Sequence, residues 1–242
     1  VLMGGWSSER EVSLRSGEAC AKALEGEGFR VTRVDVTRDV GRTLSDLRPD
    51  VALNALHGPA GEDGTIQGIL EVLRIPYTHS GVLASALAMN KKMAKVVMAA
   101  ADIPVPGGKV VSRFEAARAH VLPRPYVLKP IAEGSSFGVF IVGEGDEAPP
   151  AALAADDWPY GDQLLAEPFI AGKELTVAVL DDEALAVTEL QPAQGFYDYE
   201  AKYTDGLTVH VCPAALPPAI TAACLDLALR AHRALGCRGA SR

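Results

Sequence analysis

The feature that most constrains the fold is the alternation of short apolar runs with helical patterns across the first 79 residues. Apolar or β-branched runs predict three strands here, at residues 1–3, 30–36 and 51–56. Helical patterns fall between and after them, at residues 8–28 and 65–74. Such alternation predicts a parallel sheet with helices on its faces, and ligands gather where the strands of such a sheet end. We therefore expect the loops that begin at Gly4 and at His57 to face one cleft.

The first helix is expected to begin at a capping box. Ser8 is followed three residues later by Glu11, and this spacing lets each side chain bond the other residue's backbone N–H group. From there the helical pattern runs to about Gly28.

From about residue 80 the pattern changes to two helices followed by a β-rich region. The helical patterns cover residues 82–89 and 91–101. Further strands are predicted at residues 126–129, 139–142, 163–167 and 208–212. The stretch 174–191, broken by Asp181-Asp182, predicts a hairpin, and residues 217–235 an Ala-rich helix. A chain of 242 residues is long enough to form two or three compact units.

Charge and composition exclude several functional classes. The formal net charge is −8 and no run of Lys or Arg occurs, which argues against a nucleic-acid surface. No apolar run is long enough to cross a bilayer. The N-terminus lacks Met and a charged region, so it looks like the end of a strand whose first residues are missing rather than a signal peptide. The four cysteines are widely spaced, which favours reduced thiols in a cytosolic protein.

A lysine followed by a glycine-flanked loop is the first candidate site. Lys129 ends an apolar run, and Gly134-Ser135-Ser136-Phe137-Gly138 follows it. Glycines let the backbone approach an anion closely, and consecutive N–H groups can cradle phosphate oxygens. The loop does not fit the P-loop pattern, because no Lys-Ser or Lys-Thr pair follows the glycine. On this loop alone, a Gly/Ser hairpin turn is as good an interpretation as a phosphate site.

Three further segments strengthen the phosphate interpretation. Lys91 heads a predicted helix and adds a second cation. An apolar segment lies between Glu167 and Glu174, which suits a nucleotide because apolar groups meet the base and a carboxylate accepts ribose hydroxyls. Residues 196–203 form a polar loop with three tyrosines. A solvated acidic hairpin and a packed surface group of tyrosines are the alternatives for the last two segments.

Taken in order along the chain, five motifs resemble those of bacterial D-alanine–D-alanine ligases of the ATP-grasp superfamily. They are G-G-x-S-x-E-R-E-V-S from Gly4, H-G-x-x-G-E-D-G-x-x-Q-G from His57, K-P-x-x-E-G-S-S-x-G from Lys129, E-x-x-I-x-G-x-E from Glu167 and Y-D-Y-E-A-K-Y from Tyr197. The resemblance spans essentially all 242 residues. The motifs from His57 and Tyr197 are highly specific, whereas many ATP-grasp enzymes share the glycine loop.

The resemblance implies an α/β fold of the ATP-grasp type in three parts. Residues 1–79 would form an N-terminal substrate-binding domain with a parallel sheet, 80–166 a central ATP-grasp lid domain, and 167–242 an incomplete C-terminal ATP-grasp domain. The last two, both α+β, would clasp ATP. The implied reaction joins two D-alanines for peptidoglycan precursor synthesis: ATP phosphorylates the first, and the amine of the second attacks the D-alanyl phosphate. The expected setting is a cytoplasmic homodimer that acts on small molecules, with neither nucleic acid nor membrane as partner.

The resemblance also assigns roles to individual residues. Glu9 would hold the ammonium group of the first D-alanine, and His57 would lie beside the reacting carboxylate. A hydrogen-bonded network of Glu9, Ser135 and Tyr203 would lie beneath that substrate. The expected catalytic residues are Glu9, Ser135, Tyr203 and Arg242, and the expected substrate-binding residues are Glu9, His57 and Ser135. The expected ATP-binding residues are Lys91, Lys129, Ser136, Glu167, Phe169, Ile170, Glu174 and Lys202.

The same resemblance implies what these residues do during the reaction. The three lysines would neutralise phosphate oxygens, which is the electrostatic and positioning work that phosphoryl transfer needs. Glu167 and Ile170 would flank the adenine, and Glu174 would take the ribose hydroxyls. The loops 135–138 and 197–203 would close as lids, because an acyl phosphate hydrolyses readily in water.

Two departures from the family pattern stand out. Pro168 follows Glu167 where relatives often carry a lysine near the adenine, and Pro offers neither a charge nor an N–H group for that contact. The other departure is at Arg242, in the first half of the family's second signature. The Asp and the Glu-x-Asn pair that would bind two Mg²⁺ (or Mn²⁺) ions are expected after it, so no residue of this chain is assigned to a metal.

Two alternatives stay open. A D-alanine–D-lactate ligase would have the same fold, with a hydroxyl as the second nucleophile; by resemblance, ligases with Tyr at position 203 make the dipeptide, and those with Phe tend to accept a hydroxy acid. A nucleotide-binding module without turnover belongs to another class. Phosphate release from ATP with D-alanine and Mg²⁺ separates that module from either ligase.

Overall fold

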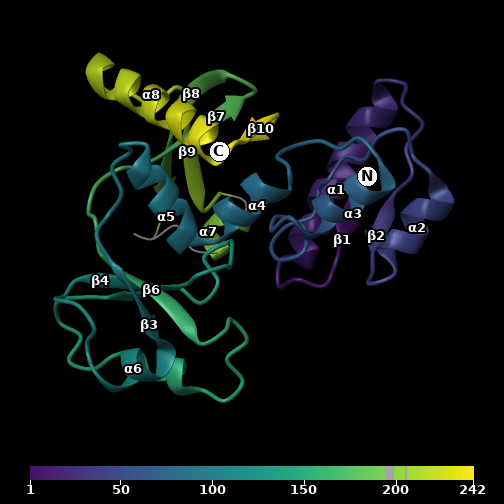
Figure 1. The fold of residues 1–242 in the computed structure, drawn as a ribbon. Helices are drawn as coiled ribbons and strands as arrows, with labels where there is room; N and C mark the ends of the chain where they lie inside the picture. The colour runs from purple at the N-terminus through teal and green to yellow at the C-terminus, as the bar shows by residue number, and fades with distance from the viewer. Residues whose placement is uncertain (194–198, 205) are drawn as a thin grey trace. The chain divides into compact units, whose positions relative to one another are not determined.

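The computed structural model describes residues 1–193, 199–204 and 206–242 (Figure 1). The chain divides into two compact units. The first contains Val1–Ala88, Val177–Leu185 and Ala228–Arg242, and the second contains Met89–Thr176 and Ala186–Leu227. The three-domain division expected from the sequence stays a prediction. Among the described residues, no helix is long and apolar enough to cross a membrane.

A parallel pair of strands carries the N-terminal part of the first unit. β1 (Leu2–Gly4) pairs with β2 (Val34–Val36), so the predicted parallel arrangement is confirmed at this pair. The helices of this part are α1 (Arg10–Gly26), α2 (Val40–Leu47), α3 (Thr65–Leu73) and α4 (Val82–Met89). The sequence did not predict α2, an eight-residue helix that contains Gly41 and has low intrinsic propensity. Burial of Val40 and Leu44, four residues apart on one face, stabilises it instead.

The expected strand at 51–56 is wrong, because this segment makes only isolated bridges. Leu2 bridges Asn54 and Ala52 bridges Tyr77, both in parallel. The backbone still makes parallel pairing bonds here, because the Leu2 N–H donates to the Leu53 carbonyl (2.8 Å) and the Ala55 N–H to the Leu2 carbonyl (2.9 Å). Next to these bonds, the Asn54 N–H donates to Thr78 Oγ1 (3.1 Å) and Asn54 Oδ1 accepts from the Leu56 N–H (3.2 Å). Local side-chain bonds of this kind compete with regular pairing.

The core of this part lies between the strands and the helices. Leu2, Leu44 and Leu70 are at most 1% exposed and belong to one apolar cluster. The buried Ser13 of α1 accepts a hydrogen bond from the Gly4 N–H (2.9 Å) and donates one to the Ala55 carbonyl (2.7 Å). These bonds fix the end of β1 and the segment before His57 against the same helix.

The predicted capping box at Ser8 and Glu11 is wrong. Helix α1 begins at Arg10 with Glu9 as its N-cap and no side-chain capping bond, so Glu11 lies one position too early for the box. Ser7 shapes the turn instead: its Oγ accepts from the Glu9 N–H (3.2 Å), and its carbonyl accepts from the Arg10 N–H (3.2 Å). The buried Glu9 side chain is thereby placed at the start of the helix, in the loop that follows β1.

An antiparallel sheet is the frame of the second unit. Its strand order is β3 (Lys109–Ser112), β6 (Gln163–Pro168), β4 (Tyr126–Pro130) and β5 (Phe140–Val142). Helix α6 (Arg113–Arg118) and the short 3₁₀ helix η1 (Ala151–Ala154) contribute Ala116 and Leu153 to the apolar cluster of one sheet face. The sequence did not predict β3 or α6, which are short, and β3 follows two glycines at an edge of the sheet.

Alternation along β4 separates the core of this sheet from a cavity. Tyr126, Leu128 and Pro130 are buried, whereas Val127 and Lys129 between them are partly exposed. Successive side chains of a strand point to opposite faces. The same strand that anchors the core therefore presents Lys129 on the other face.

Most of the remaining elements follow the sequence expectations, except the two-residue strand Ala240–Ser241, which was not predicted. Helix α5 (Lys91–Ala100) begins at Asn90, whose side chain accepts a hydrogen bond from the Met93 N–H (3.1 Å). The predicted hairpin is confirmed as the neighbouring strands β7 (Glu174–Leu180) and β8 (Glu183–Pro192). The others are β9 (Thr208–Val211), antiparallel to β8, helix α8 (Pro218–Leu235), and β10 (Ala240–Ser241), antiparallel to β7.

The predicted tyrosine loop lies partly outside the described residues. Tyr197 and Asp198 fall in the segment 194–198. Its described part forms a short helix, α7 (Tyr199–Tyr203), so an irregular loop was the wrong expectation for those five residues.

Candidate active site

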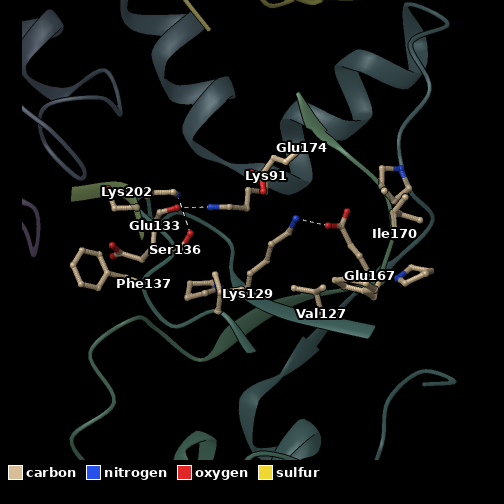
Figure 2. Close-up of a pocket in the computed structure, with 18 of the residues that line it drawn as sticks. Lys91, Val127, Lys129, Glu133, Ser136, Phe137, Glu167, Ile170, Glu174 and Lys202 are labelled. Atoms are coloured by element: carbon tan, nitrogen blue, oxygen red, sulfur yellow. Dashed lines mark hydrogen bonds and ion pairs between the residues drawn. The ribbon is translucent and has the colours of Figure 1, made fainter. Parts of the chain in front are cut away.

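A cavity of about 640 Å³ in the second unit brings together the predicted nucleotide-binding residues (Figure 2). It lies beside the exposed face of β4, the loop after that strand and the end of β6. The eight residues predicted to bind ATP all line it: Lys91, Lys129, Ser136, Glu167, Phe169, Ile170, Glu174 and Lys202. Ser135 lines it as well. Residues up to 111 positions apart in the sequence (202 − 91) therefore meet at one cavity.

Four lysines line this cavity, and three of them, Lys91, Lys129 and Lys202, were predicted to bind phosphate. Lys91, at the start of α5, donates to the carbonyl of Glu133, and Lys129 forms an ion pair with Glu167. Lys202 of α7 donates to Ser136 Oγ (2.8 Å). Each lysine has three donors and a localised charge, so an anion entering the cavity would meet several cationic hydrogen-bond donors.

The loop between β4 and β5 is tightly constrained. Ser135 and Ser136 have φ of 46° and 62°, in the left-handed region that non-glycine residues rarely adopt. Gly138 also has a positive φ, 65°, and a Cβ there would lie 2.7 Å from the Tyr160 ring. Ser135 Oγ and the Tyr203 hydroxyl are 2.7 Å apart and share a hydrogen bond. Strained residues concentrate at functional sites; here they form the loop that was predicted to hold phosphate.

The carboxylate of Glu167 lies between two lysines, and one of them was missed by sequence reasoning. Lys129 contacts it from β4 and Lys95 from α5. Burial disfavours the charged form of Glu167, but hydrogen bonds from Lys129 and Lys95 outweigh that effect and hold its pKa below the usual value. Lys95 could have been found from its spacing, because it follows Lys91 by four residues and so lies on the same face of the helix.

The opposite side of the cavity combines apolar and acidic groups. Phe169 and Ile170, after β6, are 38% and 68% exposed, so large apolar surfaces border the cavity without being buried by the protein. Burial raises the pKa of Glu174, and the charge of Lys202 opposes that shift. Exposed apolar side chains next to a carboxylate match the needs of a flat base and a sugar hydroxyl.

A second group of ionisable residues lies in the first unit. Glu9, His57 and Glu62 each place one polar atom within 4.8 Å of the others. His57 Nε2 is 3.2 Å from Ser16 Oγ, and Glu62 Oε2 accepts a hydrogen bond from the Gly58 N–H (2.6 Å). Sequence reasoning did not single out Glu62, although it belongs to the quoted motif that begins at His57.

The loop that carries His57 is built around glycines. Gly58 has a φ of 71°, and a Cβ there would collide with the Glu9 carboxylate and lie 3.2 Å from Ser7. Ser7 Oγ donates to the His57 carbonyl (2.7 Å), which ties the two loops together. The segment Gly5–Glu9 and the His57 loop, expected to face one cleft, therefore lie together within this unit, and the cleft itself stays a prediction.

Glu62 and Arg242 complete this second group. Part of the Glu62 residue is exposed to solvent, but the loss of solvent around its carboxyl group raises the pKa of that group. The nearby charge of Glu9 raises this pKa further, whereas the hydrogen bond from Gly58 and the charges of His57 and Arg242 lower it. Arg242 is thus close enough to act on Glu62 electrostatically. It follows β10, whose Ser241 Oγ lies 2.7 Å from Nδ1 of the buried His232.

This group does not fit Mg²⁺. Within residues 1–193, 199–204 and 206–242, the group of acidic, His or Cys side chains close enough to share an ion consists of Glu9, His57 and Glu62. It includes an imidazole, whereas Mg²⁺ prefers six oxygen ligands in octahedral geometry. The Glu62 carboxylate is also engaged by a backbone amide. No reaction step is therefore assigned to a metal at these residues.

Fold and cavity together define an ATP-grasp enzyme. The antiparallel sheet, the strained loop and the lysines surround one cavity, and a separate group of ionisable residues lies in the α/β part. Two family models match this chain, described as "D-ala D-ala ligase C-terminus" over residues 97–242 and "D-ala D-ala ligase N-terminus" over residues 40–80.

Individual relatives agree with these family models. The D-alanine–D-alanine ligases of Methylorubrum populi and Azorhizobium caulinodans are 65% and 66% identical, over 100% of this chain and 79% of their own length. Among solved structures, the D-alanine–D-alanine ligase of Bacillus anthracis superposes with a TM-score of 0.81 at 31% identity, covering 99% of this chain and 79% of that one. Its complex with ATP gives a TM-score of 0.80 at 28% identity, over 99% and 78% of the two chains. The chain belongs to the D-alanine–D-alanine ligase family, and the predicted ATP-grasp fold is confirmed.

Proposed function

We propose that this chain joins two D-alanines at the expense of ATP, with ATP in the lysine-lined cavity and the first D-alanine at the Glu9 group. The product, D-alanyl-D-alanine, serves peptidoglycan precursor synthesis. The observation that carries the proposal is the convergence of all eight predicted ATP-binding residues on one cavity, in a chain 65% identical over its whole length to a D-alanine–D-alanine ligase.

In the first step, an oxygen of the D-alanine carboxylate attacks the γ-phosphorus of ATP, and ADP leaves with the electrons of the broken P–O bond. Lys91, Lys129 and Lys202 bind phosphate oxygens and offset their charge, while the loop backbone at Ser135 and Ser136 positions them. Glu167 and Ile170 flank the adenine, Phe169 lines the same cavity, and Glu174 accepts the ribose hydroxyls.

In the second step, the amine of another D-alanine attacks the carbonyl carbon of the D-alanyl phosphate. Phosphate leaves, and the nitrogen loses a proton. Arg242 stabilises negative charge on the acyl phosphate, and His57 lies beside the reacting carboxylate. The hydrogen bond between Ser135 and Tyr203 holds the glycine loop to α7, which helps to exclude water from the intermediate.

The metal ion, the oligomeric state and the cellular location of the enzyme are also part of the proposal. Mg²⁺, proposed from family likeness, would supply positive charge to the phosphate groups, and no residue of this chain is assigned to hold it. The homodimer is proposed from family likeness, and a cytoplasmic location from the need for ATP. A D-alanine–D-lactate ligase remains the alternative activity, and one solved relative of 29% identity is described as a D-Ala:D-Ser ligase.

Glu9→Gln tests the placement of D-alanine. It removes the charge of the buried Glu9 side chain and keeps its shape, so the KM for the first D-alanine should rise about 10- to 100-fold, as for loss of a charge-assisted hydrogen bond. The dissociation constant of ATP should stay the same. Dipeptide formation and phosphate release, measured on the protein extended to the relatives' full length, give both values.

Glu11→Gln is the matched control for this test, because Glu11 lies on the same helix and is exposed. It should leave the KM for D-alanine within about twofold. An unchanged KM in Glu9→Gln would place the first substrate elsewhere. ATP binding without phosphate release in the unmutated protein would favour a binding module over a ligase.

Tyr203→Phe separates the two ligase activities. The change removes the hydroxyl that bonds Ser135 and alters volume little, so packing loss should be small. An amine must lose a proton before it attacks, whereas a D-lactate hydroxyl arrives uncharged. We expect unchanged D-alanine activation and a larger share of ester over dipeptide, most clearly at acidic pH. Competition between D-alanine and D-lactate from about pH 6 to 9 measures this share, and a constant ratio would leave Tyr203 as a packing residue.

A further inference from the structure

Lys95 contacts Glu167 of the nucleotide cavity from the side of helix α5, outside the cavity lining. The Lys95 ammonium bonds Glu167 Oε1, and the Lys129 ammonium bonds Glu167 Oε2. Lys129 and Glu167 line the cavity, and Figure 2 shows their ion pair, whereas Lys95 is not among the lining residues. One carboxylate thus has one cation on the cavity side and another on the helix side.

Because the Glu167 carboxylate is buried, its charge requires a cation beside it. The Glu167 side chain is 7% exposed, against 20% for Lys95 and 28% for Lys129. A buried carboxylate needs a cation beside it, because an unpaired charge away from water is costly. With Lys95 in place, that need is met even when Lys129 turns away. Without Lys95, Lys129 is the cation left to contact Glu167 among the ion pairs of the described residues.

The backbone at Gly108 passes close to this pair. A Cβ there would lie 2.5 Å from the Ala166 carbonyl oxygen, 3.0 Å from Glu167 Cγ and 3.4 Å from Lys95 Nζ, so glycine is required first by the backbone of the neighbouring strand and also leaves room for the two side chains. Helix α5 fixes the other end: Ala94, next to Lys95, is buried. Lys95 is therefore held by its helix rather than by a mobile loop.

We propose that Lys95 is a positioning residue of the ATP site, the resident counter-ion of Glu167 that allows Lys129 to leave this carboxylate and bind a phosphate oxygen. The inference rests on the proposed function, since it requires ATP in the cavity. Lys95 itself does not contact the nucleotide. By neutralising Glu167, Lys95 leaves the Lys129 ammonium free to bind a phosphate oxygen.

A double-mutant cycle tests this role in the protein extended to the relatives' full length. The four proteins are the unmutated enzyme, Lys95→Met, Glu167→Gln and the double variant. When Glu167 is present, Lys95→Met should weaken ATP binding about tenfold, because Lys129 is then held by Glu167. When Glu167→Gln is already in place, Lys129 has no carboxylate to neutralise, so Lys95→Met should cost less than about twofold. The dissociation constant of ATP, by calorimetry, and the KM values for ATP and D-alanine are measured.

Several controls distinguish this role from packing. Lys95→Arg should retain most of the affinity, and Lys92→Met, exposed on the same helix, should change it less than about twofold. The KM for D-alanine should not change in Lys95→Met. An equal loss of ATP affinity with and without Glu167→Gln, or no loss at all, would overturn the proposal. Failure of the unmutated enzyme to bind ATP would instead overturn the proposed function on which it rests.

Discussion

Lys129→Met is expected to lower kcat/KM for ATP by about 30- to 1000-fold, the equivalent of about 2–4 kcal/mol of transition-state stabilisation. Methionine keeps the unbranched stem of lysine and removes its charge. In the proposed complex this charge meets phosphate oxygens whose negative charge is redistributed during transfer, and a positioned cation does not have to reorganise for that. The loss should therefore appear in kcat as well as in ATP affinity.

The structure also predicts that this variant folds. Removing one partner of a buried ion pair is normally costly, because the other charge is left uncompensated. Glu167 keeps Lys95 as a partner when Lys129 is removed, so the melting temperature should change little. Lys109→Met, an exposed lysine of β3, is the control and should keep normal turnover. Normal ATP affinity and turnover in Lys129→Met would show that Lys129 is only a solvated charge at the end of a strand.

Arg242→Met is expected to lower kcat by about 100- to 1000-fold with little change in ATP affinity, as for removal of one preorganised charge stabiliser. The backbone just before this residue is held in place. It follows β10, in which Ser241 lies opposite Val179 and is bonded to the buried His232. A guanidinium is always charged and offers donors in a fixed fork, so methionine removes both properties.

The same variant should shift the pH dependence in a defined direction. The charge of Arg242 now works to lower the raised pKa of Glu62, so its removal should raise that pKa further. A raised carboxyl pKa keeps the acid form to higher pH. The acid limb of kcat/KM for D-alanine should therefore move to higher pH in Arg242→Met. Steady-state rates across the acidic range measure this limb.

Arg42→Met provides the reference for both effects. Arg42 is an exposed residue of α2 whose ion pair with Asp46 spans 3.8 Å, so its loss should be nearly neutral. An acid limb that stays in place in Arg242→Met would mean that Arg242 does not influence the acidic group, and an unchanged kcat would exclude it from the charge stabilisation proposed above.

Local sequence determined most of the elements. Helix α3, helix α5 and strand β4 were predictable because apolar periodicity and propensity act over a few residues. The eight residues that line the cavity were expected together because the chain resembles a known family, and the structure brings them to one cavity. Where local signals were weak or misleading, prediction failed: α2 depends on burial of Val40 and Leu44, and the capping box failed because Ser7 set the turn.

Tertiary structure alone decided which charges meet. Lys95 and Glu167 are 72 positions apart in the sequence. Apolar periodicity predicts a helix or a strand, but it does not predict which helix packs against which strand. Glu62 stood in a recognised motif together with His57, yet its raised pKa depends on the loss of solvent and on the charges of Glu9 and Arg242, which come from two other segments. Electrostatic effects depend on distance in space and on the loss of water around a group. The sequence therefore indicated which residues to expect at the two groups, and the packing of distant segments decided which charges meet and in which direction the pKa values of Glu62 and Glu167 move.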